Sequence, residues 1–381
     1  MSTVSKQDLV ESVQRVVVKI GSSLLASGSG IHQDNLVHFV AELAALQERG
    51  LEVIVVSSGA RAAGLNALSM ETIPNSIPAQ QAAAAVGQIH LMAHYERCFA
   101  EHEIKIAQVL LTAADIAHRG RYLNAKHTID YLLERGLIPI INENDSVAVD
   151  ELKFGDNDRL SALVAGLCEA ELLILLTDVE GLYDKHPKED GAALIPLVEE
   201  VSDTMLAAAQ GQGTLGTGGM LSKLEAAKAA ARRGIPTMIA KGVTQGVLSK
   251  AFDPKQEMGT LVLAAKNPLR QRKHWIGFGV TPKGQVVIDA GACKALVEKG
   301  TSLLPAGILE VRGDFEAGEC VSCLDEQEEE IARGLVVYDA RDLGKIIGAK
   351  TSEIETRLGY HFGDEIIHRD DLVLARAKEI S

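Results

Sequence analysis

Short runs of aliphatic residues alternate with longer segments in which apolar residues recur every three or four positions, up to about residue 265. The short runs, rich in Val, Ile and Leu, are typical of buried strands, and the longer segments are typical of amphipathic helices. Strands and helices that alternate in this way form βαβ units, which predict an α/β fold with a mostly parallel sheet sandwiched by helices. The predicted strands cover residues 15–20, 52–56, 106–111, 138–141, 172–177 and 236–240.

The pattern changes after residue 267, where Asn267-Pro268 and a few basic residues interrupt it. Beyond this break, short β-rich runs are separated by closely spaced turn residues, with one or two helical segments among them. We therefore expect two domains, a larger α/β domain over residues 1–267 and a small C-terminal β-rich domain over residues 275–381. The strands expected in the second domain are 275–280, 285–288, 307–311, 320–323 and 334–338.

Composition and charge narrow the class of protein. The chain has 381 residues, of which 46% are hydrophobic, and this is enough for the cores of two domains. Its formal net charge of −14 disfavours binding of nucleic acid, which requires neutralised phosphates. No signal peptide and no apolar run near the ~20 residues of a membrane span is visible, and the cysteines are odd in number and scattered. We therefore expect a cytoplasmic protein that has no membrane partner.

Small polar residues follow the first two predicted strands. Lys19 lies in the first strand, just before Gly21 and two serines, and Ser58 follows the second strand. Open α/β sheets bind ligands at the carboxyl ends of their strands, where an ammonium group and unhindered backbone N–H groups suit a phosphate. An isolated lysine before an ordinary turn, and a tight turn after the second strand, are the alternatives. The order of Lys19 and Gly21 differs from that of a Walker A loop, in which the lysine follows the glycines.

Amides and carboxylates gather at two further places. Asn142 and Asp145 belong to a run of four polar residues after the strand at 138–141. Asn157 and Asp158 precede a predicted helix, with more polar groups than a single helix cap requires. Such groups suit the ammonium or hydroxyl group of a ligand, and the additional carboxylate suits lysines or Mg²⁺. A solvated loop and a simple N-cap remain the alternatives.

Two segments further along the chain indicate a nucleotide. Thr177 and Asp178 place a hydroxyl and a carboxylate at the end of a strand, although a polar turn would look the same. A glycine-rich segment then leads into a predicted helix at 220–232, with Lys223 in its first turn. A cation there opposes the helix dipole, so this lysine indicates a bound anion such as phosphate. A flexible linker before an amphipathic helix is the alternative.

These segments, in this order, resemble the amino acid kinase family, and in particular its bacterial members that phosphorylate glutamate. The motifs that carry the resemblance are Asn142-Glu143-Asn144-Asp145, Gly155-Asp156-Asn157-Asp158 and the glycine-rich stretch that ends at Lys223. The C-terminal region, with the segment 300–307, resembles the PUA domain that many of those members carry. The resemblance covers nearly the whole chain and implies an amino acid kinase-like fold followed by a PUA-like domain.

The resemblance also implies roles for individual residues. Lys19 and Lys223 would contact the phosphates of ATP, and Asp158 would organise the two lysines. The cofactors would be ATP and Mg²⁺, with no metal-binding side chain assigned. Ser58, Asp145 and Asn157 would bind the substrate, with Asn142 nearby. The residues that would bind ATP are Lys19, Thr177, Asp178, Thr217, Gly218, Gly219, Met220, Leu221, Ser222 and Lys223.

The implied reaction is ATP-dependent phosphorylation of the side-chain carboxylate of L-glutamate, the first step of proline biosynthesis. The family further implies inhibition by L-proline and a homo-oligomer, either a dimer or a tetramer. Sister kinases acting on acetylglutamate, aspartate, carbamate or a nucleoside monophosphate remain alternatives, although Asp145 and Asn157 favour a free amino acid. An RNA-linked protein and an inactive nucleotide sensor are also open. Residues 275–381 hold 12 Lys and Arg against 20 Asp and Glu, a net charge of −8 that disfavours RNA.

Overall fold

The computed structural model describes residues 6–27, 30–70, 76–148, 157–187, 189–211, 219–266, 273, 276–277 and 280–375. The chain divides into two compact units, which are described separately. The first comprises residues 1–113 and 126–266, and the second comprises residues 114–125 and 267–381. This division differs from the expected domains, 1–267 and 275–381, in the short segment 114–125. No helix in the described part of the chain is long and apolar enough to cross a membrane.

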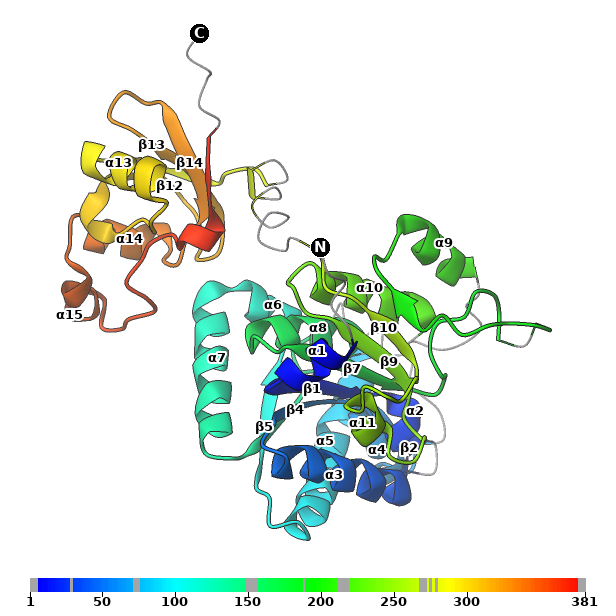
Figure 1. Ribbon diagram of the computed structural model, residues 1–381. Coiled ribbons are helices and arrows are strands. Elements are labelled where there is room, and N and C mark those ends of the chain that lie inside the picture. Colours follow the sequence, from blue (N-terminus) through cyan, green and yellow to red (C-terminus); the bar gives the residue numbers. More distant parts are fainter. Residues whose placement is uncertain are drawn as a thin grey trace. The chain divides into compact units, whose positions relative to one another are not determined.

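An eight-stranded sheet forms the centre of the first unit (Figure 1). In spatial order its strands are β5 (Ile106–Leu111), β6 (Ile138–Glu143), β4 (Glu52–Ser57), β1 (Arg15–Ile20), β7 (Leu172–Thr177), β9 (Thr237–Lys241), β10 (Thr260–Val262) and β8 (Leu197–Val198). β1 lies between β4 and β7, with Val18 opposite Val55 and Ile174. All these pairings are parallel except that of β9 with β10.

The predicted mostly parallel α/β sheet is therefore confirmed, and all six predicted strands are present. β8 and β10 were not predicted because they have only 2 and 3 residues, too few to show a periodicity. A two-stranded ribbon, β2 (Ala26–Ser27) with β3 (Gly30–Ile31), stands apart from the large sheet.

Helices cover both faces of the sheet (Figure 1). Successive side chains of β1 point to opposite faces. Val16 and Val18 join the core formed with α3 (Gln33–Glu48) and α5 (Ile77–Ala100). Lys19 points to the other face, where α8 (Asp158–Leu167) packs on β1 and against α10 (Met220–Ala231). The remaining helices of the chain up to residue 251 are α1 (Lys6–Ser12), α2 (Ser22–Leu25), α4 (Ala60–Ala67), α6 (Ala113–Ala117), α7 (Arg119–Glu134), α9 (Asp203–Gly211) and α11 (Val247–Ala251).

The second unit contains a five-stranded sheet. In spatial order its strands are β12 (Ile308–Gly313), β11 (Gly284–Ile288), β13 (Cys320–Leu324), β14 (Glu330–Leu335) and β15 (Leu372–Leu374). The expected small β-rich unit is confirmed. Its short helices are α13 (Ala290–Lys299), η3 (Pro305–Gly307), α14 (Ala340–Ile346), η4 (Thr351–Glu353), α15 (Ile354–Leu358) and η5 (Arg369–Asp371).

Two strand predictions in this unit need comment. The strand expected at 334–338 is wrong in position, since β14 covers Glu330–Leu335 and shares only two residues with it. The charged residue Glu330 is accommodated in the strand by an ion pair with Arg333. Val337 and Tyr338 are buried in the core beyond the end of that strand, which explains their strand-like composition. Of the strand expected at 275–280, residues 275, 278 and 279 lie outside the described residues, and the described residues 276–277 and 280 are not in a strand.

Helices α4 and α5 touch through their glycines. A Cβ atom added to Gly64 would lie 1.7 Å from the carbonyl oxygen of Ala83, and one added to Gly87 would lie 1.7 Å from that of Ala60. No side chain fits at either position, so the two backbones are in direct contact. Because α4 starts just after Ser58 at the end of β4, this contact fixes α5 close to the edge of the sheet where ligands are expected.

We predict that Gly87→Ala destabilises the protein by about 3 kcal/mol or more, because the new methyl group meets backbone atoms that cannot move away cheaply. Gly344→Ala in α14 is the control, since a Cβ there meets no atom within 4 Å. It should be neutral or stabilise its helix by up to about 1 kcal/mol. Denaturant unfolding measures both, and equal stability of the two variants would contradict the direct backbone contact.

Candidate active site

Three charged side chains from distant parts of the chain meet on one face of the sheet. Lys19 lies next to the last residue of β1, Asp158 is the first residue of α8, and Lys223 lies in the first turn of α10. Lys19 Nζ is 2.6 Å from Asp158 Oδ1, and Lys223 Nζ is 3.2 Å from Asp158 Oδ2. One carboxylate therefore bridges two lysines, each with a different oxygen.

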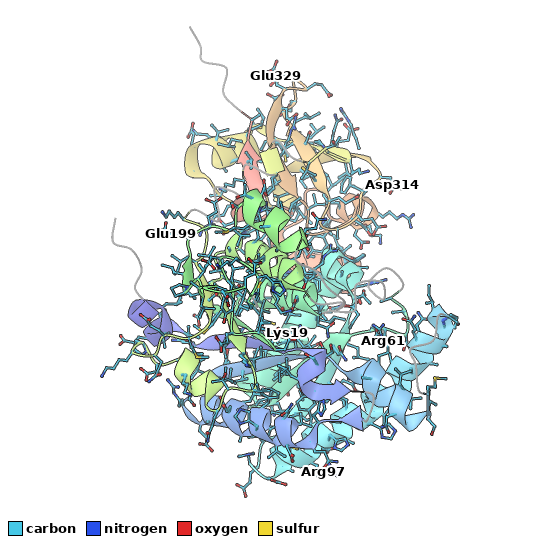
Figure 2. The ribbon with its side chains drawn as sticks, turned by 90° about the vertical axis from the view of Figure 1, so that its right-hand side faces the viewer. Lys19, Arg61, Arg97, Glu199, Asp314 and Glu329 are labelled. Atoms are coloured by element: carbon cyan, nitrogen blue, oxygen red, sulfur yellow. The ribbon has the colours of Figure 1, made fainter. Side chains whose placement is uncertain are left out.

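The cluster is almost completely buried. Asp158, Lys19 and Lys223 are 0%, 1% and 4% exposed. In Figure 2, Lys19 lies among the strands and helices, whereas the labelled Arg97 and Glu199 lie at the exposed periphery. Buried charges are tolerated when they are paired, and the Asp158 carboxylate pairs with both ammonium groups. Ammonium groups held in this way suit an anionic ligand such as a phosphate.

The strand ends around the cluster are tied together by backbone hydrogen bonds. Gly21 N donates to Leu176 O at 3.2 Å, and Gly242 N donates to Thr177 O at 2.8 Å. The carboxyl ends of β1, β7 and β9 thus form one edge. Thr177 is buried and donates to Asp178 Oδ1 at 3.0 Å, and Asp178 is exposed.

The residues expected to bind ATP lie at the start of α10. Gly219 is the N-cap residue, and a Cβ there would meet no atom within 4 Å. Ser222 Oγ donates to Asp158 Oδ2 at 2.8 Å, which places it beside the lysines. Met220 and Leu221 are half-buried in the same turn of the helix. Thr217 and Gly218 lie outside the described residues.

The amide residues expected to bind the substrate form a second group. Asn157 Nδ2 donates to Asn142 Oδ1 at 2.7 Å and also to the carbonyl oxygen of Ser57. Ser58 is buried, and its hydroxyl has no partner among the described residues. The structure therefore brings Asn142 and Asn157 together at the end of β4, where Ser58 follows.

Asp145 contributes to a neighbouring cavity. It is half-buried and lines a cavity of about 220 Å³. Two other polar residues of that lining are Glu143 and Gln88. Gln88 was not predicted from the sequence, and the only signal for it is a polar residue on the buried face of an alanine-rich helix. Among the described residues, no group of three His, Cys, Asp or Glu side chains is placed to hold a metal ion.

We predict that Asp158→Asn destabilises the protein by about 3–5 kcal/mol, because two buried ammonium groups lose their shared counter-charge. Asp203→Asn is the matched control. Asp203 also stands first in a helix and pairs with a lysine of α10, Lys228, at 2.7 Å, but it is fully exposed. Its replacement should leave the melting temperature unchanged. Equal melting temperatures for the two variants would show that the Asp158 carboxylate does not compensate the lysines.

Comparison with known proteins identifies the family of the chain. The amino acid kinase family model matches residues 14–241, and the PUA domain model matches residues 284–358. The chain is 51% identical to the glutamate 5-kinase of Trichlorobacter lovleyi over 97% of this chain and 99% of that protein. It is 48% identical to the glutamate 5-kinase of Geobacter sulfurreducens, over 97% and 100% of the two chains. It is 46% identical to the glutamate 5-kinase of a Thermoanaerobacter species, over 96% and 99%. The chain therefore belongs to the amino acid kinase family and carries a C-terminal PUA domain.

Proposed function

We propose that the chain catalyses the ATP-dependent phosphorylation of the side-chain carboxylate of L-glutamate to L-glutamyl 5-phosphate, the first step of proline biosynthesis. Relatives named glutamate 5-kinase match almost its full length at 46–51% identity. The observation in the structure that supports the proposal is the buried pair of lysines around Asp158, next to the carboxyl ends of the strands where such sheets bind ligands.

The proposed reaction needs charge stabilisation and no general base. A carboxylate with a solution pKa of about 4.3 is already ionised at neutral pH, so the nucleophile needs no general base. The obstacle is repulsion between that carboxylate and the γ-phosphoryl group of ATP. In the proposal, Lys19 and Lys223 offset the charge on the phosphates, and the Asp158 carboxylate holds both ammonium groups in place. Mg²⁺ bound with ATP would supply further charge neutralisation.

The remaining residues divide between the two substrates in the proposal. Asp145 would pair with the α-ammonium group of glutamate, while Ser58 and the Asn142–Asn157 pair would provide hydrogen bonds around it. The nucleotide would bind at the other end of the site. Its contacts would come from Thr177, Asp178 and residues 217–223, next to the lysines.

Regulation, assembly and location are further parts of the proposal. L-proline shares its α-ammonium and α-carboxylate groups with glutamate, so it would inhibit by occupying the same pocket. We also propose a homo-oligomer and a cytoplasmic location, and the five unpaired cysteines support a reducing compartment. RNA is not proposed as a partner, because the net charge of −8 over residues 275–381 would repel phosphates.

A sister kinase that acts on an N-acylated amino acid is the competing function, and substrate choice separates the two. We expect ADP release to require free L-glutamate and to be weak with N-acetylglutamate, whose α-nitrogen has no charge to pair with Asp145. Hydroxylamine trapping of the acyl phosphate, run beside the ADP assay, checks that the carboxylate is the acceptor. Preference for N-acetylglutamate would overturn the proposal.

Loss of a phosphate-facing lysine should affect turnover more than substrate binding. We expect Lys223→Ala to lower kcat by roughly 10²-fold or more, on the scale of one lost charge-stabilising donor, with a much smaller change in the KM for glutamate. Lys228→Ala, five positions further along α10, is the control because Lys228 pairs with the exposed Asp203. A kcat near that of the wild type for Lys223→Ala would exclude this lysine from the reaction.

A further inference from the structure

Three side-chain amides form a hydrogen-bonded relay beside the proposed substrate site. Asn157 Nδ2 donates to Asn142 Oδ1 at 2.7 Å, and Asn142 Nδ2 donates to Gln88 Oε1 at 2.7 Å. The three residues come from the start of α8, the end of β6 and the middle of α5. Gln88 is the inner end of this amide relay, and neither the motifs nor the family resemblance gave it a role.

Backbone groups fix the direction of the amide relay. The carbonyl oxygen of Ser57 accepts from Asn157 Nδ2, and the backbone N–H of Glu143 donates to Asn142 Oδ1 at 2.9 Å. A carbonyl can only accept and a backbone N–H can only donate, so neither asparagine can reverse its amide without losing a bond. Asn142 therefore presents its NH₂ group to Gln88. Both bonds of Asn157 use its NH₂ group, which leaves Oδ1 as an acceptor for a ligand.

Stability does not explain a glutamine at this position. Gln88 is 8% exposed, and its Nε2 has no acceptor among the described residues. A buried donor without a partner costs about 1–3 kcal/mol. Its neighbours on the buried face of α5, Ala84 and Leu91, are apolar. An apolar residue at position 88 would remove this unpaired donor and leave Asn142 Nδ2 without its acceptor, so the glutamine brings no net gain in stability.

We propose that Gln88 is a positioning residue of the amino-acid substrate site. Its Oε1 holds the Asn142 amide, which in turn keeps Asn157 in the orientation whose Oδ1 accepts a hydrogen bond from the substrate's ammonium group. Gln88 also lines the cavity of about 220 Å³ with Glu143 and Asp145, two carboxylates that favour a cationic group. This inference rests on the proposed function, since it requires a substrate with a free ammonium group.

Gln88→Met tests the relay, because methionine keeps the length of the side chain and removes the acceptor. We expect the KM for L-glutamate to rise about tenfold, as for one lost hydrogen bond, while kcat and the KM for ATP change less than about twofold. The melting temperature should change little. The variant removes one unpaired buried donor, Gln88 Nε2, and creates another, Asn142 Nδ2, so the two effects offset each other.

Gln47→Met is the matched control for this variant. Gln47 also stands in a helix and donates from its side-chain amide, to Gly136 O at 2.8 Å, at a site on α3 remote from the relay. It should leave all three kinetic constants unchanged. An unchanged KM for glutamate in Gln88→Met, or an equal rise in the KM for ATP, would overturn the positioning role.

A double-mutant cycle shows whether Gln88 acts through Asn142. In an Asn142→Ala background the relay is already broken, so Gln88→Met should raise the KM for glutamate by less than about twofold. A full additional tenfold rise would overturn the relay. The proposed function is judged separately, by whether the wild-type protein releases ADP with L-glutamate. If it used another amino acid instead, the same cycle on the KM for that amino acid would decide on the relay.

Discussion

One carboxylate bridges two buried ammonium groups, and much of the first unit is arranged around this cluster. Lys19 is placed by the central strand, while Asp158 and Lys223 are placed by the first turns of two helices that pack against each other. Removing Asp158 would take from both buried ammonium groups the carboxylate that they share, which is costly. The packing of α8 on β1 and of α10 against α8 is therefore set by charge as well as by apolar contacts.

A second constraint links the substrate side of the site to the fold. The glycines of α4 and α5 allow backbone contact, and this holds α5 near the end of β4, where Ser57 and Ser58 lie. Gln88 directly follows Gly87, so the same backbone contact also places Gln88, the inner end of the amide relay. The small residues of α5 thus determine how closely a polar side chain approaches the asparagines. Packing between helices and hydrogen bonding within the site cannot be changed independently here.

The sheet and the charged cluster could be predicted because each leaves a local signal in the sequence. Lys19 interrupts an aliphatic strand, and Lys223 opposes a helix dipole. Gln88 and Gly87 leave no such signal, since a glutamine and a glycine in an alanine-rich helix are equally compatible with an exposed surface. Only tertiary packing shows which face of the helix they occupy. The position of β14 was missed for a related reason, because the apolar residues after it are buried without being part of the strand.

The order of the charged residues along the chain has a consequence for synthesis on the ribosome. Lys19 and the aliphatic strand around it emerge long before Asp158, and before β7, the second neighbour of β1. Until Asp158 is made, the face of β1 that carries Lys19 lacks the carboxylate that bridges the two lysines, so packing on that face is completed late. The Lys19 face of the strand therefore stays open until synthesis has passed β7, whereas α3 and α5, which cover Val16 and Val18 on the other face, are made earlier. An open strand face on a growing chain is a site for aggregation, the hazard that chaperones counter.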